Sequence, residues 1–484
     1  MTFAEQMNWI EREHKFPEDP ALFNNKRFAR LLSESGLRER LASIPGIVGA
    51  GSCGKASTLS FTARIFSALG LRCAVGVKPP LNESPLGNLE RYQLWDGPEG
   101  GRRMTPAELS ELFPMLREAV LKTEAESPEL GSAAPYDMRA LLLEAFAVSQ
   151  RADLLVSEAN IGRRRDPVSC LPDTVLTLIT PIGTDHGGLL TAPEGFHPEL
   201  GAKAGPFFDK ADGLRLGKAA VFGRQDCDIR SLLDPRSVIY GRDYTAADCA
   251  SSLSGTSFRL RISSDLSRYL DIDAETLGGR TFKLQALGRF QCENAAQALT
   301  AALVLRRRAR LLTEGSDDPL RPYLDSRLCG ALLGGSLDDF LEAASLGLKA
   351  ACVPGRLQLL EPDCISAVAS SPEKLGALLQ SLSELGGGRR FCVCATFLDR
   401  IHYLKEAVEL LAAWPENEFT LITKFLDDDV NRDIDPGRAA AFCSNAAVCP
   451  DPKAACETVK ERARRSGSMV LFLGNGMLSF LNQP

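Results

Sequence analysis

Residues 49–58 read Gly-Ala-Gly-Ser-Cys-Gly-Lys-Ala-Ser-Thr, and this glycine-rich stretch decides the fold that we predict for the chain. The residues before it, 44–48, read Ile-Pro-Gly-Ile-Val and end as a short apolar strand. The residues after it, 59–69, place apolar side chains at helical spacing, and Gly70 ends that helix. A strand, a glycine-rich turn and a helix in this order predict the start of an α/β domain.

The same stretch is typical of a phosphate-binding loop. Glycines let successive N–H groups turn toward one anion, and the N-terminus of the following helix adds partial positive charge. Lys55 would reach the outer phosphates of a nucleotide, and a nearby hydroxyl would hold Mg²⁺. The common pattern has Ser or Thr directly after the lysine, whereas this chain has Ala56 there, followed by Ser57 and Thr58. We therefore predict nucleotide binding, with an ordinary strand–helix turn as the alternative.

Length and composition exclude several classes of protein. A chain of 484 residues is too long for one ordinary core, so we expect at least two domains. The net charge of −6 argues against bulk electrostatic binding to nucleic acid or to an anionic membrane surface. The 14 cysteines are scattered without a C-x-x-C pair, which predicts reduced thiols in a cytoplasmic protein. The N-terminus lacks a signal-peptide pattern, and no apolar run is long enough to span a bilayer.

Polar side chains follow two further predicted strands. Residues 152–158 are an apolar run that ends at Glu158, and residues 174–180 are another, after which come Asp185 and His186. The carboxyl ends of parallel strands meet at one edge of a sheet, where open α/β sheets bind their ligands. One carboxylate together with phosphate oxygens suffices for Mg²⁺, which keeps several of its waters. We therefore expect Glu158 and His186 near the loop, while a structural histidine is the alternative for His186.

The later part of the chain continues the α/β pattern. Residues 226–285 are rich in strands and turns, and the basic run 306–311 is interpreted as the solvated end of a helix. Short apolar strands alternate with helical patterns after about residue 354, which predicts a doubly wound α/β domain. The predicted strands of that domain are residues 391–395, 418–423, 446–449 and 469–473.

Six segments, taken in order, resemble the Mur ligase superfamily and, within it, the folylpolyglutamate synthase and dihydrofolate synthase branch. The phosphate loop of that family, G-T-N-G-K-G-S, resembles residues 51–57, and its serine two places after the lysine matches Ser57. The other family segments, each given with the residues of this chain that resemble it, are E-V-G-L-G-G-R-L-D (158–166), N-I-G-x-D-H (181–186), E-K-A-G-I (202–206), G-R-H-Q-x-x-N-A-A (288–296) and W-P-G-R-L (353–357).

The resemblance implies two domains: a P-loop, Mur-ligase-like ATP-binding domain with an N-terminal helical extension, residues 1–352, and a Rossmann-like C-terminal α/β domain, residues 353–484. It implies a ligase that uses ATP and Mg²⁺ to phosphorylate a carboxylate, after which the amine of an amino acid such as glutamate attacks the acyl phosphate to form an amide. A folate as the acceptor, a role in one-carbon metabolism and a monomeric state are also what this branch implies.

Individual roles carry over by position. The family's carbamylated lysine, which helps hold a second metal ion, matches Lys203. Gln291 and Asn294 match nucleotide contacts, although both are also suited to cap a helix, and Lys203 is also suited to a solvated surface. The implied catalytic residues are Lys55, His186 and Lys203, and the implied metal ligands are Ser57, Glu158, His186 and Lys203. The implied nucleotide-binding residues are Gly51, Ser52, Cys53, Gly54, Lys55, Ala56, Ser57, Thr58, Gln291, Asn294 and Arg356.

Three segments depart from the family pattern. The family's T-S-P-H-L reads Val77-Lys-Pro-Pro-Leu81, which puts Lys78 in place of a metal-binding serine, where a cation would repel or replace Mg²⁺. This segment also opens a stretch to about residue 103 that predicts a loop. The family's D-G-A-H-N-P, which binds ATP and places the C-terminal domain, reads Ala-Val-Ala-Ser-Ser-Pro at residues 367–372, and its folate-facing D-A-T-N reads Asp-Pro-Val-Ser at residues 166–169.

These departures define the alternative function: a nucleotide-binding protein that has lost or reduced ligase activity and acts through a partner. The carboxylate, histidine and lysine at positions 158, 186 and 203 favour the enzyme instead. A P-loop kinase or GTPase is disfavoured, because those proteins place Ser or Thr where this chain has Ala56.

Overall fold

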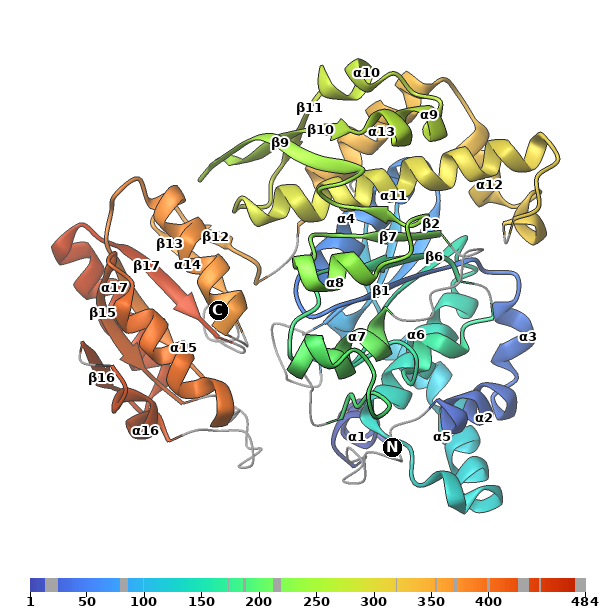
Figure 1. Ribbon diagram of the computed structural model, residues 1–484. Helices are drawn as coiled ribbons and strands as arrows, with labels where there is room; N and C mark the ends of the chain where they lie inside the picture. The colour runs from blue at the N-terminus through green and yellow to red at the C-terminus, as the bar shows by residue number, and fades with distance from the viewer. Residues whose placement is uncertain are drawn as a thin grey trace.

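The chain folds into two bodies, an N-terminal body that holds the elements up to α13 and a C-terminal body that holds those from β12 onward (Figure 1). The computed structural model describes residues 1–13, 25–78, 86–98, 100–172, 174–185, 189–211, 219–318, 320–352, 355–369, 372–397, 401–424, 435–443 and 445–474. The exact division between two domains at residues 352 and 353 stays a prediction.

An eight-stranded sheet forms the centre of the N-terminal body. Its neighbouring strands run parallel except for the pairs β2/β3 and β3/β4, which are antiparallel. The strands predicted from apolar runs are present, but the loop predicted between residues 78 and 103 is wrong in part, since β3 and β4 lie there. The order across the sheet is β4 (Arg102–Arg103), β3 (Tyr92–Asp96), β2 (Arg72–Gly76), β5 (Leu154–Glu158), β1 (Gly46–Ala50), β6 (Thr174–Ile179), β7 (Ala219–Phe222), β8 (Val238–Ile239).

Helices cover both faces of this sheet. On one face α4 (Lys55–Ala68) and α11 (Phe290–Thr313) pack against each other and both contact the sheet, α13 (Leu337–Ala350) packs on α4, and most side chains of α4 are buried. The other face carries the N-terminal helices together with α5 and α6. The elements of that second layer are α1 (Phe3–Asn8), the π-helix η1 (Trp9–Glu13), α2 (Lys26–Glu34), α3 (Leu37–Leu41), α5 (Pro106–Glu126) and α6 (Pro135–Ser149).

A small antiparallel sheet, β11-β10-β9, packs on α11 and confirms the strand-rich region predicted between residues 226 and 285. The basic run near the end of α11 is not solvated as expected. Arg306 and Arg308 are buried, and Arg308 donates to the backbone carbonyl of Val175 at 2.6 Å. The remaining elements of this body are β9 (Tyr244–Ser252), β10 (Gly255–Ile262), β11 (Thr281–Leu284), η3 (Gly87–Arg91), η4 (Pro128–Leu130), η5 (Pro167–Cys170), η6 (Pro198–Lys203), η7 (Arg321–Tyr323), α7 (Ala204–Lys210), α8 (Cys227–Leu232), α9 (Ser264–Leu270), α10 (Ala274–Gly278) and α12 (Arg327–Leu333).

The C-terminal body is a six-stranded sheet that is parallel except for the pair β12/β13. Helices α14 and α15 pack on one face of this sheet and α17 on the other, as in a doubly wound fold. Its strand order is β12 (Gln358–Glu361), β13 (Cys364–Ala367), β17 (Met469–Leu473), β14 (Phe391–Ala395), β15 (Asn417–Ile422), β16 (Ala446–Val448), and its helices are α14 (Pro372–Gly386), α15 (Ile401–Ala413), α16 (Pro436–Ala440) and α17 (Pro452–Ser466).

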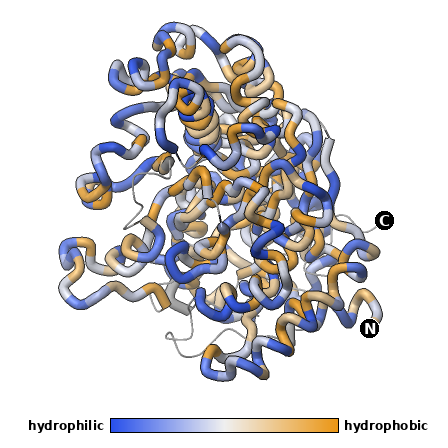
Figure 2. Tube along the Cα trace, turned by 90° about the vertical axis from the view of Figure 1, so that its right-hand side faces the viewer, coloured by the Kyte–Doolittle hydropathy of each residue, from blue (hydrophilic) through white to orange (hydrophobic). Residues whose placement is uncertain are grey.

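Hydrophobic and hydrophilic segments alternate along most outer helices, as expected for helices that pack on a sheet with one face (Figure 2). All 14 cysteines are free thiols, and several of them belong to the buried cores, as predicted. Among the helices that the structure describes, none has the length and hydropathy needed to cross a membrane.

Candidate functional site

The phosphate loop has the backbone conformation that its glycines allow. Gly51 and Gly54 have φ values of +137° and +84°. A Cβ atom on Gly54 would lie 2.6 Å from Oδ1 of Asn294, so a side chain is excluded by space as well as by conformation. The first hydrogen bond of α4 runs from the N–H of Thr58 to the carbonyl of Gly54 at 2.9 Å. The N–H groups of residues 55–57 precede that bond, and an α-helix leaves such groups available for an anion.

The front of the loop is fixed by the segment that follows β6. The N–H of Ser52 donates to the carbonyl of Pro181 at 2.7 Å, and the hydroxyl of Ser52 accepts the N–H of Gly183 at 2.8 Å. The same hydroxyl donates to Oδ1 of Asp185. These hydrogen bonds fix the conformation of the loop. The N-terminus of α4, which carries partial positive charge, remains available for an anion.

A buried lysine, Lys210, contacts both partners of the hydrogen bond between Ser52 and Asp185. Nζ of Lys210, at the end of α7, donates to Oδ1 of Asp185 at 2.7 Å and to Oγ of Ser52 at 3.1 Å, and its side chain is fully buried. Burial lowers the pKa of Lys210 to about 8, although Asp185 acts in the opposite direction. Burial raises the pKa of Asp185, but Lys210 and Lys55 outweigh it and hold that pKa well below its ordinary value.

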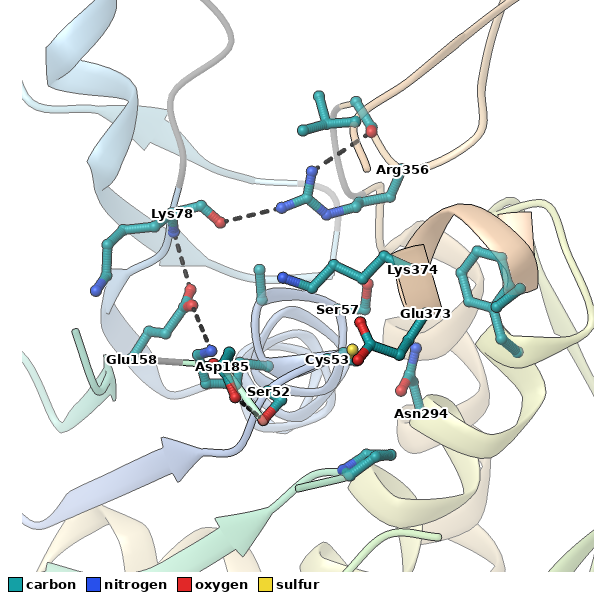
Figure 3. A pocket seen from close by; sticks show the side chains of 18 of the residues that line it. Ser52, Cys53, Ser57, Lys78, Glu158, Asp185, Asn294, Arg356, Glu373 and Lys374 are labelled. Atoms are coloured by element: carbon teal, nitrogen blue, oxygen red, sulfur yellow. Dashed lines mark hydrogen bonds and ion pairs between the residues drawn. The ribbon is translucent and has the colours of Figure 1, made fainter. Parts of the chain in front are cut away.

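The loop opens into a cavity of about 730 Å³ between the two bodies (Figure 3). Its walls come from the phosphate loop, from the segments after β2, β5 and β6, from the first turn of α11, and from the segments on either side of β12 and β13. The carboxyl edge of a parallel sheet is where such folds bind ligands. The predicted residues that line this cavity are Ser52, Cys53, Gly54, Lys55, Ala56, Ser57, Glu158, Asn294 and Arg356.

Opposite charges meet at the centre of the cavity. Nζ of Lys55 donates to the carbonyl of Gly51 at 2.8 Å and lies 3.8 Å from Oε1 of Glu158. The other oxygen of Glu158 accepts the backbone N–H of Lys78 at 2.9 Å, an interaction drawn in Figure 3. Glu158 therefore lies near the loop, as expected from its place at the end of a strand, and its carboxylate faces Lys55.

Lys78, at the position where the resemblance implies a serine, does not direct its ammonium at Glu158. Its Nζ donates to Oδ1 of Asn160 at 2.7 Å and to the carbonyl of Ala159 at 3.3 Å. Burial lowers the pKa of Lys78, while Glu158 and Asp166 raise it. This cation therefore belongs to the part of the cavity beyond Glu158, which Arg91, Tyr136 and Arg139 also line.

Lys203, where the resemblance implies a carbamylated lysine of the metal site, does not lie in the cavity. Its Nζ donates to Asp226 and, at 3.1 Å, to Asp228, and this side chain does not line the cavity. Hydrogen bonds to these two carboxylates raise the pKa of Lys203, which keeps it an ammonium rather than the neutral amine that a carbamate requires. The lysine that reaches the phosphate loop is Lys210, seven residues later.

A signal for Lys210 exists in the sequence. Asp209, Lys210 and Ala211 repeat the acid-lysine-alanine order of the family segment, whereas Lys203 follows an alanine. Asp209 is held by the N–H of Arg163 at 2.7 Å and by Nε of Arg165 at 2.8 Å. These contacts from the segment after β5 orient the end of α7 toward the phosphate loop.

Two other predicted nucleotide contacts lie behind the cavity wall. Gln291 is fully buried and accepts a hydrogen bond from Nδ2 of Asn294 at 3.0 Å. Thr58 is also buried, and its hydroxyl lies 3.4 Å from Oδ1 of Asn294. Both side chains therefore orient Asn294, which does line the cavity.

Three of the four predicted metal ligands, Ser57, Glu158 and Lys203, belong to the described residues. His186 lies outside the described residues, as do residues 79–85. In the described part of the chain, which excludes His186, no group of three or more His, Cys, Asp or Glu side chains is arranged to hold a metal ion. The residues present fit one Mg²⁺ through the Ser57 hydroxyl and the Glu158 carboxylate, which both line the cavity beside Lys55.

Lys374 and Glu373, in the first turn of α14, line the cavity from the C-terminal body and were not predicted from the sequence. The guanidinium groups of Arg91 and Arg139 were not predicted either. No local pattern marks these four residues, because each reaches the cavity only through the packing of distant segments.

No protein-family model and no curated protein sequence matches the chain. Solved structures do: the Mycobacterium tuberculosis folylpolyglutamate synthase complexed with ADP matches with a TM-score of 0.72 at 18% identity, over 100% of this chain and 99% of that one. The Thermotoga maritima folylpolyglutamate synthase matches with a TM-score of 0.69 at 17% identity, over 98% and 94% of the two chains. The apo form of the L. casei enzyme matches with a TM-score of 0.69 at 16% identity, over 99% and 98%.

The chain has the folylpolyglutamate synthase fold. This finding confirms the predicted fold class and, at the level of fold, the predicted resemblance to the Mur ligases. Other solved folylpolyglutamate synthases are complexes with AMPPCP, or with AMPPCP and folate. In this chain the folylpolyglutamate synthase fold places the phosphate loop, Glu158 and Lys374 around one cavity.

Proposed function

We propose that the chain binds ATP with Mg²⁺ and catalyses ATP-dependent formation of an amide bond between a carboxylate and the amine of an amino acid such as glutamate. The observation that carries this proposal is the pair Lys55 and Glu158, 3.8 Å apart, at the N-terminus of α4 in a cavity between two bodies. A ligase needs cations for the transferring phosphate and a closed space for the acyl phosphate.

Each residue has a definite task in this reaction. The N–H groups at the start of α4 and the ammonium of Lys55 neutralise the outer phosphates of ATP. Mg²⁺, when bound by Ser57 and Glu158, supplies further neutralisation of the phosphoryl group. Asn294, oriented by Gln291 and Thr58, provides polar contacts on the side of α11.

The acceptor belongs beyond Glu158, where Lys78, Arg91 and Arg139 line the cavity. Arg139 donates to Glu11 at 2.9 Å and Arg91 lies 3.8 Å from the same carboxylate, so three cations stand beside one internal anion. They suit a further carboxylate, that of the acceptor, which attacks the terminal phosphate of ATP to form an acyl phosphate and ADP. A folate is the acceptor that the resemblance implies, and a monomeric, cytoplasmic enzyme of one-carbon metabolism is part of the same proposal.

A second candidate is a nucleotide-binding protein with lost or reduced ligase activity that acts through a partner. Two observations favour it: Lys203 is engaged by Asp226 and Asp228 outside the cavity, and β13 with the residues after it lacks the aspartate and histidine of the family motif. Lys210 at the phosphate loop weakens the first of these observations.

The test is ADP release by the purified protein with Mg-ATP, L-glutamate and a panel of carboxylates that includes dihydropteroate and tetrahydrofolate. Acceptor-dependent release that is lost in Lys55→Ala, and kept in a Lys283→Ala control at an exposed lysine of β11, supports the ligase. ATP binding without turnover on any acceptor favours the second candidate. Absence of ATP binding overturns both.

A further inference from the structure

The first turn of α14 carries charged side chains from the C-terminal body into the cavity. Glu373 and Lys374 both line it, and Figure 3 shows the Lys374 ammonium directed into the cavity, on the side where Ser57, Glu158 and Lys78 lie. Helix α14 is 15 residues long, so its N-terminus adds partial positive charge at the same place.

Cations from both bodies surround the same space. Lys55 comes from the phosphate loop, whereas Arg356 and Lys374 come from the chain next to β12 and from α14. Nη2 of Arg356 donates to the backbone carbonyl of Lys78 at 3.3 Å, so the two bodies already touch beside this cluster. Burial lowers the pKa of Lys374; Lys55 and Arg356 act in the same direction, while Asp185 and the thiol of Cys53 act against it.

Like charges that face one half-buried cavity repel one another unless an anion lies between them. On the side of the sheet, Glu158 accepts the backbone N–H of Lys78 and faces the ammonium of Lys55, while Asp185 accepts a hydrogen bond from the ammonium of Lys210. Glu373 also lines this space, so four cations (Lys55, Lys78, Arg356 and Lys374) face three carboxylates (Glu158, Asp185 and Glu373), and a polyanion would balance the remaining positive charge.

We infer that Lys374 binds the terminal phosphate of a nucleoside triphosphate held by the phosphate loop. The inference rests on the proposed nucleotide binding and goes beyond it, because it assigns to the C-terminal body a phosphate contact at a residue outside the segment 367–372. Only a triphosphate carries the terminal phosphate assigned to Lys374, so this contact would distinguish a triphosphate from a diphosphate. Lys374 thereby couples the terminal phosphate to the position of the C-terminal body.

The position of Lys374 favours phosphate over the carboxylate of the acceptor. Lys374 lines the cavity together with Cys53 and Lys55 of the phosphate loop. The cavity has other cations for the acceptor, Arg91 and Arg139, which lie beside the carboxylate of Glu11.

The experiment compares the affinities for ADP and for AMPPCP, with Mg²⁺, by isothermal titration calorimetry. The variants are Lys374→Ala, Lys374→Arg and, as a matched control, Lys453→Ala at an exposed lysine of α17 in the same body. Loss of one charge-assisted contact is expected to weaken AMPPCP binding by about tenfold or more in Lys374→Ala and to change ADP binding less than about twofold. Lys374→Arg is expected to keep most of the preference for the triphosphate.

Three results overturn the inference. Equally weakened binding of ADP and AMPPCP in Lys374→Ala would indicate a general structural effect. A thermal unfolding scan of each variant shows whether that variant is folded. Unchanged AMPPCP binding, with weaker binding of a carboxylate acceptor instead, would assign Lys374 to the acceptor. Failure of the wild-type protein to bind either nucleotide would overturn the proposed function together with this inference.

Discussion

Nζ of Lys210 lies 2.7 Å from Oδ1 of Asp185, and this buried ion pair joins the end of α7 to the segment that fixes the phosphate loop. Ser52 of the loop contacts both partners. The contact explains how residues separated in the chain by more than a hundred positions form one site. It also shows that Lys210, and not Lys203, contacts the phosphate loop.

We expect Lys210→Met to destabilise the protein much more than Lys203→Met. Removal of Lys210 leaves the Asp185 carboxylate without its buried partner, and such a loss costs about 3–5 kcal/mol at full burial and less here, because Asp185 is partly exposed. The partly exposed pairs of Lys203 are worth only about 0–1 kcal/mol. Urea unfolding of both variants measures the difference, and equal midpoints would contradict the structure.

When CO₂ and Mg²⁺ are supplied, we expect the lysine carbamate that the resemblance placed at Lys203 to form at Lys210 instead, where it would replace the ion pair between Lys210 and Asp185. A carbamate forms when a neutral amine attacks CO₂ and releases a proton, and burial lowers the pKa of Lys210 to about 8, whereas Lys203 is held as an ammonium. The measurement is ¹³C NMR of the protein with ¹³C-bicarbonate and Mg²⁺, in Lys203→Met and Lys210→Met. A carbamate signal lost in Lys203→Met and kept in Lys210→Met would refute the assignment, and a wild-type spectrum without the signal would show that Lys210 stays an ammonium.

We expect Glu158→Gln to reduce the dependence of nucleotide binding on Mg²⁺. The amide keeps an oxygen for the N–H of Lys78 but lacks the negative charge that attracts the metal ion and faces Lys55. AMPPCP binding is titrated by calorimetry with Mg²⁺ and with EDTA. A wild-type gain from Mg²⁺ of about tenfold or more that survives unchanged in Glu158→Gln would remove Glu158 from the proposed metal site.

Glu144 predicts how stability depends on pH. It is buried in α6, Oε2 has no hydrogen-bond partner among the described residues, and burial raises the pKa of Glu144 well above its ordinary value. Between the unfolded and folded pKa values the folded protein keeps this proton and the unfolded chain loses it, so the contribution of Glu144 to stability falls as pH rises above about 4.5.

We therefore expect Glu144→Gln to lose less stability than the wild type between pH 5 and pH 8. The free energy of unfolding is measured in urea at both values, with Glu118→Gln, at an exposed position of α5, as the control. A wild-type difference that the substitution leaves unchanged would show that Glu144 is ionised in the folded protein.

The sequence by itself determined the backbone plan of this protein. Glycines at residues 51 and 54 are required by positive φ, the apolar runs on either side of the loop predict β1 and α4, and Ser57 follows Lys55 at the spacing of the family segment that the loop resembles. Such features depend on residues close together in the chain, so periodicity and backbone conformation suffice to predict them.

Only the tertiary structure decided which side chains meet in the cavity. Lys203 and Lys210 are both followed by alanine, and Asp209 before Lys210 is the only local difference that matches the family segment; in the structure Arg163 and Arg165 hold Asp209, and Lys210 rather than Lys203 faces the phosphate loop. Lys374 reaches the cavity because the C-terminal body packs next to the phosphate loop. The physical reason is that the position of a side chain in a site is set by packing between segments far apart in the chain, and local patterns carry no record of those contacts.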